Sequence, residues 1–386
     1  MTRALRRIGL NLLFLVPGET GGMETYARRL IPALASALPD RELVAFIGSE
    51  ASEIGIPQFG EGVRVVALGS TRHRFRRVAL EQLVLPRIVR RERIDLLHSL
   101  GTTAPARLGY ASVVTIHDVI YATHPEAHTT AMRLGLRLLV PLAARSADRI
   151  ITPSEAAKRD VVARLGVAAE RVDVIHSAGG LSPGPATPEE ELRRRYGLGD
   201  APLVLSVSAR RPHKNLVRLL EAFARVRHEP APLLVLPGYR TAFEGEVQGA
   251  VVRLGLEERV RTLGWVPDED LEGLYAAAAC FVFPSLAEGF GQPVLEAMER
   301  GVPVATSDAS SLPEVGNDAV LYFDPLDVAA IADAIRTLLA ERSIAERLAA
   351  AGRARAREFS WERTARATIE VYRRAFADHA RRRPAT

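Results

Sequence analysis

Residues 285–301 have the sequence Ser285-Leu-Ala-Glu-Gly-Phe-Gly-Gln-Pro-Val-Leu-Glu-Ala-Met-Glu-Arg-Gly301. The apolar stretch 279–284 before it predicts a short buried strand, and Pro293 stands where the first residue of a helix is expected. A strand, a glycine turn and a helix N-terminus together form an anion site, because backbone N–H groups and the positive end of the helix dipole point to one spot.

Two carboxylates, Glu288 and Glu296, flank this turn. A phosphate ligand that carries hydroxyls on both sides, such as a nucleotide-sugar, would suit that arrangement. We expect Glu296 in the opening turn of the helix, reaching back to a ribose, and Glu288 on the side of a hexose. The alternative is that Glu296 only interacts favourably with the helix dipole and that Glu288 is a solvated charge in a loop.

The rest of the chain alternates apolar strands with amphipathic helices, which predicts an α/β fold with parallel sheets. A segment dense in glycine, proline and serine, 177–188, interrupts the alternation, which then restarts. The predicted architecture is two Rossmann-like, doubly wound domains facing a cleft. The expected domains are 1–180, a linker over 181–200, a second domain over 201–362, and a C-terminal helix and tail over 363–386 that return to the first domain.

Composition excludes several classes of protein. The chain has 386 residues, enough for two domains, with 47% hydrophobic and 25% charged residues, as in soluble globular proteins. Its single cysteine, Cys280, excludes an intramolecular disulfide framework and fits a reducing cytoplasm. The net charge is +5, but no aromatic-and-basic motif for nucleic acid accompanies it. The apolar N-terminal stretch ends at Pro17-Gly18 without a cleavage site, so it predicts a first strand rather than a signal peptide.

A second constellation is Arg210-Arg-Pro-His-Lys-Asn215, between a predicted strand and a helix. An Arg/Lys pair at the end of a strand can neutralise a departing diphosphate. Only Lys158 and Lys214 are lysines among 51 basic residues, so Lys214 is a compact point charge where arginine would be usual. The alternative is a chance lysine in an exposed loop.

Two further motifs lie in the first half. In Thr115-Ile-His-Asp118, His117 could act as an acid or base or hold a sugar hydroxyl, or the pair could cap a strand and a turn. Gly21 and Gly22 follow the first predicted strand and would let a ligand approach the backbone, but they do not match a dinucleotide fingerprint.

With these motifs the chain resembles the retaining glycosyltransferases of family 4, which have the two-Rossmann GT-B fold, and in particular bacterial mannosyltransferase-like members. The resemblance runs nearly end to end. It is carried by the glycine pair, the His-Asp pair, 152–155, the lysine loop, 283–298, 301–304, 310–314 and 359–361.

The resemblance implies roles for these residues. Glu296 would bind the ribose and Glu288 the transferred sugar, while Gly289, Phe290, Gly291 and Gln292 would hold sugar hydroxyls and phosphate. Lys214 with Arg210 would stabilise the diphosphate, His117 and Asp118 would act near the reacting carbon, and Gly21 and Gly22 would lie near the phosphates. The family needs no divalent metal or other cofactor. Where it usually has glycine or arginine before the lysine, this chain has Ser208, Ala209 and His213, so Arg210 or Arg211 must substitute.

The resemblance favours transfer of mannose from GDP-mannose to a glycan or lipid-linked acceptor in cell-envelope polysaccharide or glycolipid synthesis. The alternatives are a nucleotide-sugar 2-epimerase of the same fold and a non-catalytic nucleotide-sugar-binding protein. We expect a cytoplasmic protein that binds no specific nucleic acid. The basic and apolar stretches 71–80 and 133–141 suggest peripheral contact with the anionic inner face of the plasma membrane, or else helices packed on a sheet with arginines outward.

Overall fold

The computed structural model describes residues 5–18, 20–53, 59, 62–106, 109–127, 129–180 and 184–382. Contacts divide the chain into two compact units, which we call the first unit (1–178 with 360–386) and the second unit (179–359). Among the described residues, no helix is both long and apolar enough to cross a lipid bilayer.

The first unit is built on a parallel sheet of seven described strands in the order β3-β2-β1-β4-β5-β6-β7. These strands are β1 (Arg7–Asn11), β2 (Glu42–Ile47), β3 (Val63–Ala67), β4 (Leu96–Ser99), β5 (Ala111–Thr115), β6 (Arg149–Thr152) and β7 (Val172–Val174). The central strands are buried on both faces, which explains why they read as continuous apolar runs rather than as alternating patterns.

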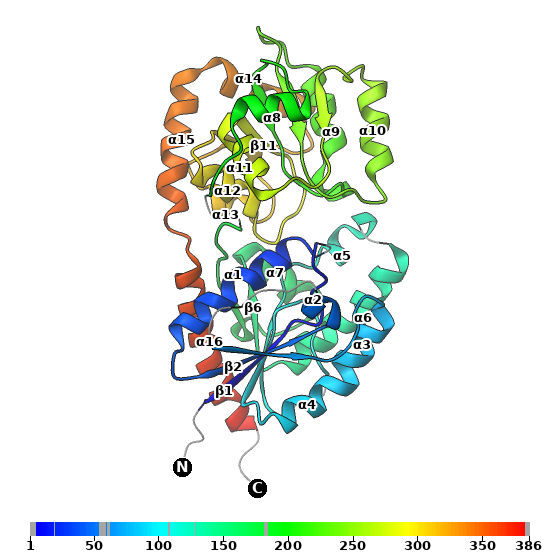
Figure 1. The fold of residues 1–386 in the computed structure, drawn as a ribbon, viewed down its shortest axis with the longest axis vertical. Coiled ribbons are helices and arrows are strands. Elements are labelled where there is room, and N and C mark those ends of the chain that lie inside the picture. Colours follow the sequence, from blue (N-terminus) through cyan, green and yellow to red (C-terminus); the bar gives the residue numbers. More distant parts are fainter. Residues whose placement is uncertain are drawn as a thin grey trace. The chain divides into compact units, whose positions relative to one another are not determined.

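Helices cover both faces of this sheet (Figure 1). They are α1 (Gly22–Ala37), α2 (Ser49–Glu53), α3 (Arg74–Ala79), α4 (Leu85–Arg91), α5 (Ile120–Thr123), α6 (Thr130–Ser146), α7 (Glu155–Leu165) and α16 (Trp361–Arg382), with single turns at Leu80–Val84, Pro125–Ala127 and Ala169–Arg171. On one face, α1 and α16 pack against Ile8 and Leu10. On the other, α4 packs against Val44 and Phe46, and α6 packs against Val114.

Two elements of the first unit differ from the sequence-based expectation. The first strand was expected over Arg7–Val16 but ends at Asn11, because residues 12–16 form a buried turn region after the strand. The amphipathic pattern over Arg77–Arg90 predicts one helix, but the observed helical segment begins at Arg74 and contains a π-helical turn, Leu80–Val84. That turn carries the buried Glu81, whose Oε1 accepts hydrogen bonds from Asn11 Nδ2 (2.9 Å) and Thr103 Oγ1 (3.2 Å).

The second unit repeats the plan with six described strands in the order β10-β9-β8-β11-β12-β13, all parallel. They are β8 (Leu203–Leu205), β9 (Leu233–Leu236), β10 (Val260–Thr262), β11 (Ala278–Phe283), β12 (Val304–Ser307) and β13 (Leu321–Phe323). The order in which strands are added to the sheet reverses direction between β8 and β11, and this switch point is where ligands bind in doubly wound sheets.

Its helices are α8 (Glu189–Tyr196), α9 (Leu216–Ala224), α10 (Glu244–Arg253), α11 (Asp268–Ala277), α12 (Gln292–Glu299), α13 (Leu312–Gly316), α14 (Val328–Ala340) and α15 (Arg342–Ala356), with a 3₁₀ turn at Pro212–Lys214. The linker expected over 181–200 is therefore wrong for its described part, which contains α8. Leu192 of α8 is fully buried, and a Cβ on Gly273 of α11 would lie 2.3 Å from its Cδ1. The close contact fixes α8 to α11 within the second unit.

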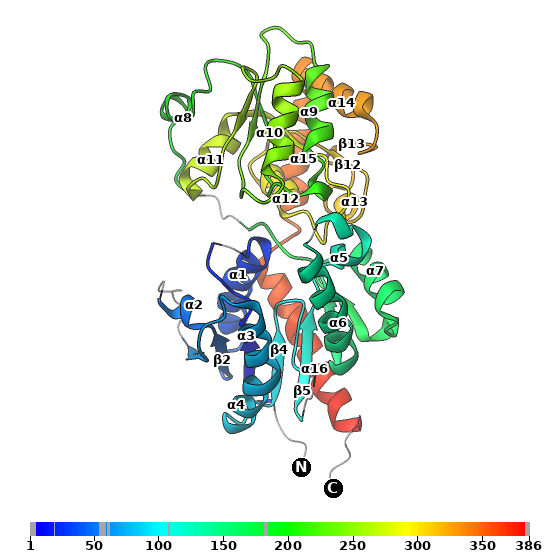
Figure 2. The same ribbon diagram turned by 90° about the vertical axis from the view of Figure 1, so that its right-hand side faces the viewer.

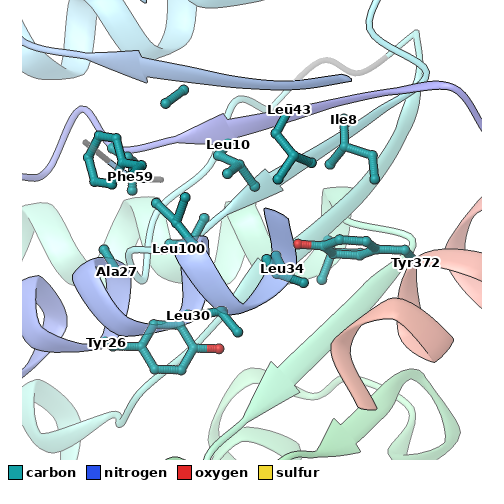
Figure 3. Close-up of a cluster of buried hydrophobic side chains, with 14 of the residues drawn as sticks. Ile8, Leu10, Tyr26, Ala27, Leu30, Leu34, Leu43, Phe59, Leu100 and Tyr372 are labelled. Carbon is teal, nitrogen blue, oxygen red and sulfur yellow. The ribbon is translucent and has the colours of Figure 1, made fainter. Parts of the chain in front are cut away.

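The C-terminal helix α16 belongs to the first unit, as expected (Figure 2). Figure 3 shows Tyr372 of α16 in the apolar cluster that also contains Ile8 of β1 and Leu34 of α1. Its hydroxyl lies 2.7 Å from Nδ1 of His98, and Nε2 of that buried ring lies 2.8 Å from Oγ1 of Thr115. One buried hydrogen-bonded chain thus links the last helix to strands β4 and β5.

This chain makes the stability of the first unit depend on pH. Burial lowers the pKa of His98 from 6.5 to about 3. An unfolded chain binds this proton below pH 6.5 while the folded chain does not, so the free energy of unfolding falls as the pH drops from 6.5 toward 3, by up to about 1.4 kcal/mol per pH unit. Between about pH 7 and about pH 5, we expect the free energy of unfolding of His98→Gln to fall by about 2 kcal/mol less than that of the wild type. Urea unfolding at the two pH values measures it.

The exposed His73, replaced by glutamine in the same way, is the control and should keep the wild-type pH dependence. Equal pH dependence in His98→Gln and the wild type would show that His98 is not the titrating group.

Candidate functional site

Two loops of the second unit meet beyond the carboxyl ends of β8 and β11. The 3₁₀ turn Pro212–Lys214 follows β8, and residues 284–291 follow β11. The loops are joined by two hydrogen bonds: Leu286 N–H donates to His213 O (2.8 Å), and Asn215 Nδ2 donates to Pro284 O (3.1 Å). Two loops from distant parts of the sequence are therefore held together at one edge of the sheet.

The structure brings Lys214 and Glu288 together at this edge. Nζ of Lys214 lies 2.5 Å from Oε1 of Glu288 and 5.4 Å from the centroid of the Phe283 ring. The two charged side chains are only 16% and 10% exposed. The pair is thus largely buried and lies beside an aromatic ring, which restricts where both charges can lie. A ligand phosphate could replace Glu288 as the partner of Lys214, and ligand hydroxyls could replace Lys214 as the partner of Glu288.

The glycine turn after β11 leads into the N-terminus of helix α12, which has no side-chain cap. Gly291 has φ +108°, and a Cβ there would lie 2.6 Å from Cδ2 of Leu312, so both conformation and space require glycine. Helix α12 begins at Gln292 with no side-chain cap and no acid in its first turn. The positive end of its dipole therefore faces the turn without a competing carboxylate of its own first turn.

Two serines of the 310–314 motif, to which the sequence analysis assigned no role, hold the turn in shape. Ser311 is fully buried, and the single hydrogen of its hydroxyl is shared between Phe290 O (2.8 Å from Oγ) and Glu288 O (3.1 Å). Ser310 Oγ donates to Glu288 O (2.7 Å) and accepts from Glu288 N (3.2 Å). Because a trans peptide is planar with its C=O and N–H opposed, holding these two carbonyls directs the N–H groups of Gly289 and Gly291 away from the serines.

Glu296 lies in the second turn of α12, so the expectation that it lies in the opening turn is wrong. Its Oε2 accepts from the Tyr275 hydroxyl (3.1 Å), and its Oε1 accepts from Gly180 N (3.1 Å). Burial, together with the neighbouring Glu296, raises the pKa of Tyr275 well above its usual value, so the phenol keeps its proton and donates. Arg300 pairs with the buried Glu272 and lies 5.0 Å from the Tyr275 ring centroid, which fixes the tyrosine in place.

Arg210 does not share this site, contrary to the prediction that it partners Lys214 on a diphosphate. Its side chain is completely buried, and its guanidinium donates to the carbonyl oxygens of Ser208 (3.1 Å), Leu236 and Leu263. These carbonyls lie at or just after the ends of β8, β9 and β10. Arg210 therefore closes the ends of three strands and has a structural role.

Phe290 and Gln292, expected at the ligand, occupy different environments. The Phe290 side chain is buried, with its ring edge against Phe359 (centroids 5.8 Å apart). Gln292 is the half-buried first residue of α12, beside the turn. Any contact of Phe290 with a ligand would therefore have to come from its backbone.

In the first unit, the loop with Gly21 and Gly22 is held by an acid. Gly21 is the N-cap of α1, with φ +54°. Glu24, in the first turn of α1, accepts at Oε2 from Gly18 N (2.9 Å) and Thr20 Oγ1 (3.3 Å) and forms an ion pair with Arg28. A carboxylate thus already occupies this helix N-terminus, which makes it less suited to phosphates than the turn at Gly291.

His117 and Asp118 follow β5 at the carboxyl edge of the first sheet. His117 Nε2 lies 2.9 Å from Leu100 O and must carry a proton to bond it, and burial lowers the pKa of the ring. The neutral ring therefore presents Nδ1 as an acceptor. Its centroid is 4.8 Å from that of Tyr26, in an edge-on contact. Asp118 Oδ1 accepts from Ile120 N (2.9 Å) and caps the turn that begins α5, which is the structural alternative to a catalytic role.

Within the described residues, no group of three or more histidine, cysteine, aspartate or glutamate side chains is placed to hold a metal ion. The site residues present carboxylates, one lysine and a helix N-terminus. Such a set can bind a phosphate at one end and hydroxyls at the other.

Comparisons with known proteins match both halves of the chain. The family model described as Glycosyltransferase Family 4 matches residues 20–178, and the one described as Glycosyl transferases group 1 matches residues 188–355. The chain is 37% identical to O-antigen chain mannosyltransferase B of Escherichia coli over 287 residues, which cover 72% of this chain and 74% of that protein. It is 31% identical to an MMP alpha-(1->4)-mannosyltransferase of Mycolicibacterium hassiacum over 310 residues, 75% of this chain and 72% of the other.

Solved structures share the fold end to end. A sucrose-phosphate synthase from Thermosynechococcus elongatus superimposes with a TM-score of 0.78 at 22% identity, covering 96% of this chain and 99% of that one. The Anabaena protein HepE, solved in complex with UDP and glucose, gives 0.74 at 22% identity over 95% and 98% of the two chains. The fold is thus GT-B, as expected. Together with the family matches, it shows that this chain is a glycosyltransferase and belongs to glycosyltransferase family 4.

Proposed function

We propose that the protein transfers mannose from GDP-mannose, with retention of configuration, to a glycan or lipid-linked acceptor in the synthesis of a cell-envelope polysaccharide or glycolipid. The observation that carries the proposal is the Lys214–Glu288 pair in the loop that leads into the N-terminus of α12. The choice of mannose is supported by relatives that are named mannosyltransferases, among them two that are 37% and 31% identical to this chain.

In this proposal the second unit holds the donor. The diphosphate lies at the N-terminus of α12 and takes Lys214 from Glu288. The released Glu288 carboxylate then accepts hydroxyl groups of the sugar, and Glu296, held by Tyr275, accepts those of the ribose. On the first unit by itself, the neutral ring of His117 leaves Nδ1 able to accept a hydroxyl group of a ligand.

The reaction breaks the bond between the sugar C1 and the diphosphate oxygen, and the electron pair stays on that oxygen. Lys214 and the helix dipole stabilise the charge that develops there. The acceptor oxygen forms the new bond on the same face and passes its proton to the departing diphosphate, so no protein nucleophile is required. Positive charge for the leaving group comes from Lys214 and the turn, and transfer is therefore proposed to need no divalent cation.

The same arrangement gives a reason for selecting an intact nucleotide-sugar over a nucleoside diphosphate. Either ligand takes Lys214 away from Glu288, which is only 10% exposed. A nucleoside diphosphate leaves that carboxylate with no new partner, at a cost of about 1–3 kcal/mol. The sugar supplies hydroxyl donors at that position, so the donor should bind more tightly than its product.

Donor choice is tested by thermal unfolding with GDP-mannose, GDP, UDP-glucose and dTDP-glucose. A ligand at about 100 times its Kd stabilises by about 2.7 kcal/mol, which corresponds to a rise in Tm of about 5–10 °C for a unit of this size. We expect GDP-mannose to give the largest rise, GDP a smaller one, and the other sugars little. A large shift with UDP-glucose and none with GDP-mannose would contradict the proposed donor.

The Lys214 side chain is tested by GDP release from GDP-mannose, in buffer with EDTA, with and without a glycolipid extract as the acceptor source. Lys214→Ala should lower kcat about 100- to 1,000-fold because the leaving group loses its charge partner. Lys214→Arg should recover only part of the rate, since the planar guanidinium does not replace a compact ammonium. Lys158→Ala removes the only other lysine and is the matched control.

Three outcomes would contradict the proposal, two in this assay and one in the product that it forms. Sugar conversion without an acceptor at the full rate would indicate an epimerase. Wild-type activity of Lys214→Ala would remove the lysine from the mechanism. An anomeric proton signal in the product that differs in configuration from the donor would contradict retention.

The serine that shapes the turn is tested by two substitutions, Ser311 in the loop after β12 and Ser307 at the last residue of β12. Ser311→Ala removes the donor to Glu288 O and Phe290 O, so we expect the Kd for GDP-mannose to rise about 5- to 10-fold. Ser307→Ala removes an equally buried hydroxyl, which donates to Ser285 O (2.6 Å) outside the turn, and should leave this Kd near the wild-type value. Equal Kd values in both variants, by titration calorimetry, would show that Ser311 does not position the turn.

A further inference from the structure

A buried acid of the first unit, Glu81, has no part in the sugar chemistry proposed above. It is only 4% exposed and lies in the π turn Leu80–Val84, which joins α3 to α4 (Figure 2). Burial raises the pKa of its carboxyl group, so holding an acid at this position costs free energy of folding. π turns are rare insertions in α-helices and occur frequently at functional sites. A buried acid and a π turn at one place indicate that the turn holds something in position.

The acid is bonded to the switch point of the first sheet. The strand order reverses direction between β1 and β4, and ligands bind at such points in doubly wound sheets. β1 ends at Asn11 and β4 ends at Ser99, and these two residues are paired in the sheet. Asn11 Nδ2 donates to Glu81 Oε1 (2.9 Å) and to Ser99 Oγ (3.1 Å). Through Asn11, Glu81 is therefore attached to the ends of both strands. We call residues 100–106, which follow β4, the β4 loop.

The π turn holds the second half of the β4 loop with two consecutive side chains. Thr103 Oγ1 donates to Glu81 Oε1 (3.2 Å). The next residue, Gln82, uses both ends of its carboxamide. Its Nε2 donates to Ala104 O (2.9 Å), and its Oε1 accepts from Ala106 N (2.9 Å). Two neighbouring residues of the turn therefore fix three residues of one loop.

The first residues of the β4 loop are held by other parts of the sheet edge. Leu100 N donates to the last carbonyl oxygen of β1 (3.3 Å), and Leu100 O accepts from Nε2 of His117 (2.9 Å). A Cβ on Gly101 would lie 2.6 Å from Cδ1 of Phe14, which belongs to the residues that follow β1. The loops on the two sides of the switch point therefore pack directly against each other.

These contacts leave the hydroxyl of Thr102 available at the switch point. Its side chain is half-buried and forms no hydrogen bond within the part of the chain that the structure describes. The residues on both sides of it are fixed, Gly101 by Phe14 and Thr103 by Glu81. A hydroxyl held in this way can donate to one oxygen and accept from another, which suits the hydroxyl groups of a sugar.

The alternative is that the π turn only supports the fold. Support alone would be met by apolar packing, which Gly101 and Phe14 already provide, and replacing buried charged groups by apolar ones is often stabilising. A fully bonded polar cluster instead specifies one position of the loop. A side chain that binds a ligand needs such precision, to within about 0.5 Å.

We propose that Glu81 and Gln82 are positioning residues for glycosyl transfer, which hold the β4 loop so that Thr102 binds a hydroxyl group of the acceptor sugar. The inference rests on the proposed transferase function, because transfer requires an acceptor, but it does not depend on mannose or on GDP. All the residues that carry it belong to the first unit.

Sugar binding to the full chain tests this placement. The probes are the methyl α-pyranosides of mannose, glucose and galactose, measured by saturation-transfer NMR in the presence of GDP. We expect at least one of them to bind the wild type. Gln82→Leu removes both contacts to the β4 loop at similar side-chain size, so the Kd for this glycoside should rise about 10-fold. Thr102→Val removes only the hydroxyl and should raise the Kd about 5- to 10-fold.

Two further variants separate positioning from folding. Glu81→Gln keeps an oxygen that can accept from Asn11 and Thr103, so the glycoside Kd should stay within about twofold of the wild-type value. Gln248→Leu is the matched control for Gln82→Leu, because the amide of Gln248 bonds only side chains of the second unit in the described structure. It should bind the glycoside as the wild type does.

Donor binding and turnover supply a second readout. The Kd for GDP-mannose, by titration calorimetry, should be equal in Gln82→Leu and the wild type, because the proposed donor residues lie in the second unit. With the glycolipid extract as the acceptor source, Gln82→Leu should raise the acceptor KM about 10-fold and change kcat by less than about twofold. A mere loss of folded protein would lower the rate without raising this KM.

Three results would overturn the inference. One is failure of all three glycosides to bind the wild type, and another is an equal glycoside Kd in the wild type, Gln82→Leu and Thr102→Val. The third is a parallel loss of GDP-mannose binding in Gln82→Leu, which would show a general effect on the fold. Glycoside binding that depends on Gln82 in a protein that binds no GDP-mannose would instead support the inference and contradict the proposed donor.

Discussion

Parallel strand pairing in both sheets is the constraint on which the rest of this structure depends. Every described strand pair is parallel, so each strand must be followed by a crossover, and all strand carboxyl ends meet at one edge of each sheet. Between β8 and β11 the crossovers leave in opposite directions, and the two loops after these strands face each other. Lys214 and Glu288 meet at that position because the topology brings them there, although 74 positions separate them. Helix α12 starts from the same edge and adds its dipole.

Buried charges near this edge divide into those that hold the scaffold and those that can act on a ligand. Arg210 is completely enclosed and saturates strand-end carbonyls, and Arg300 with Glu272 supports Tyr275. Removing one member of such a pair leaves a buried charge without compensation, which is strongly destabilising. Lys214 and Glu288 differ because each remains partly exposed and each has a partner that a ligand can replace. Charge alone therefore does not identify a residue that can act on a ligand. Such a residue must also be partly exposed and have a partner that the ligand can replace.

The sequence predicted the elements that carry a local signal. The alternating pattern predicts strands at Val63–Ala67, Arg149–Thr152 and Leu233–Leu236 and a helix at Asp268–Ala277, which are the observed bounds of β3, β6, β9 and α11. It missed α8 because the glycines and prolines nearby suggested a linker. It also missed the π turn at Leu80–Val84, because Glu81 points inward there and no local pattern in the sequence indicates a buried acid. Arg210 and Lys214 could not be told apart, since which side chain turns inward depends on the neighbouring strands. Ser310 and Ser311 did carry a signal in the sequence. They are two adjacent hydroxyl residues in the loop after β12, and β12 is the neighbour of β11, the strand that the glycine turn follows.

The serines also explain why a short glycine turn can be specific. Glycine at 291 is required by a φ of +108° and by Leu312, but the same freedom would let the turn adopt other shapes. Ser310 itself has φ +59°, a conformation that a serine adopts at some cost and keeps only when its surroundings determine it. Here the surroundings are the Glu288 and Phe290 backbone groups, each bonded to a serine hydroxyl. The loop after β12 therefore bears the strain that orients the loop after β11. The anion-binding turn is preorganised by its neighbour because glycine cannot fix its own conformation.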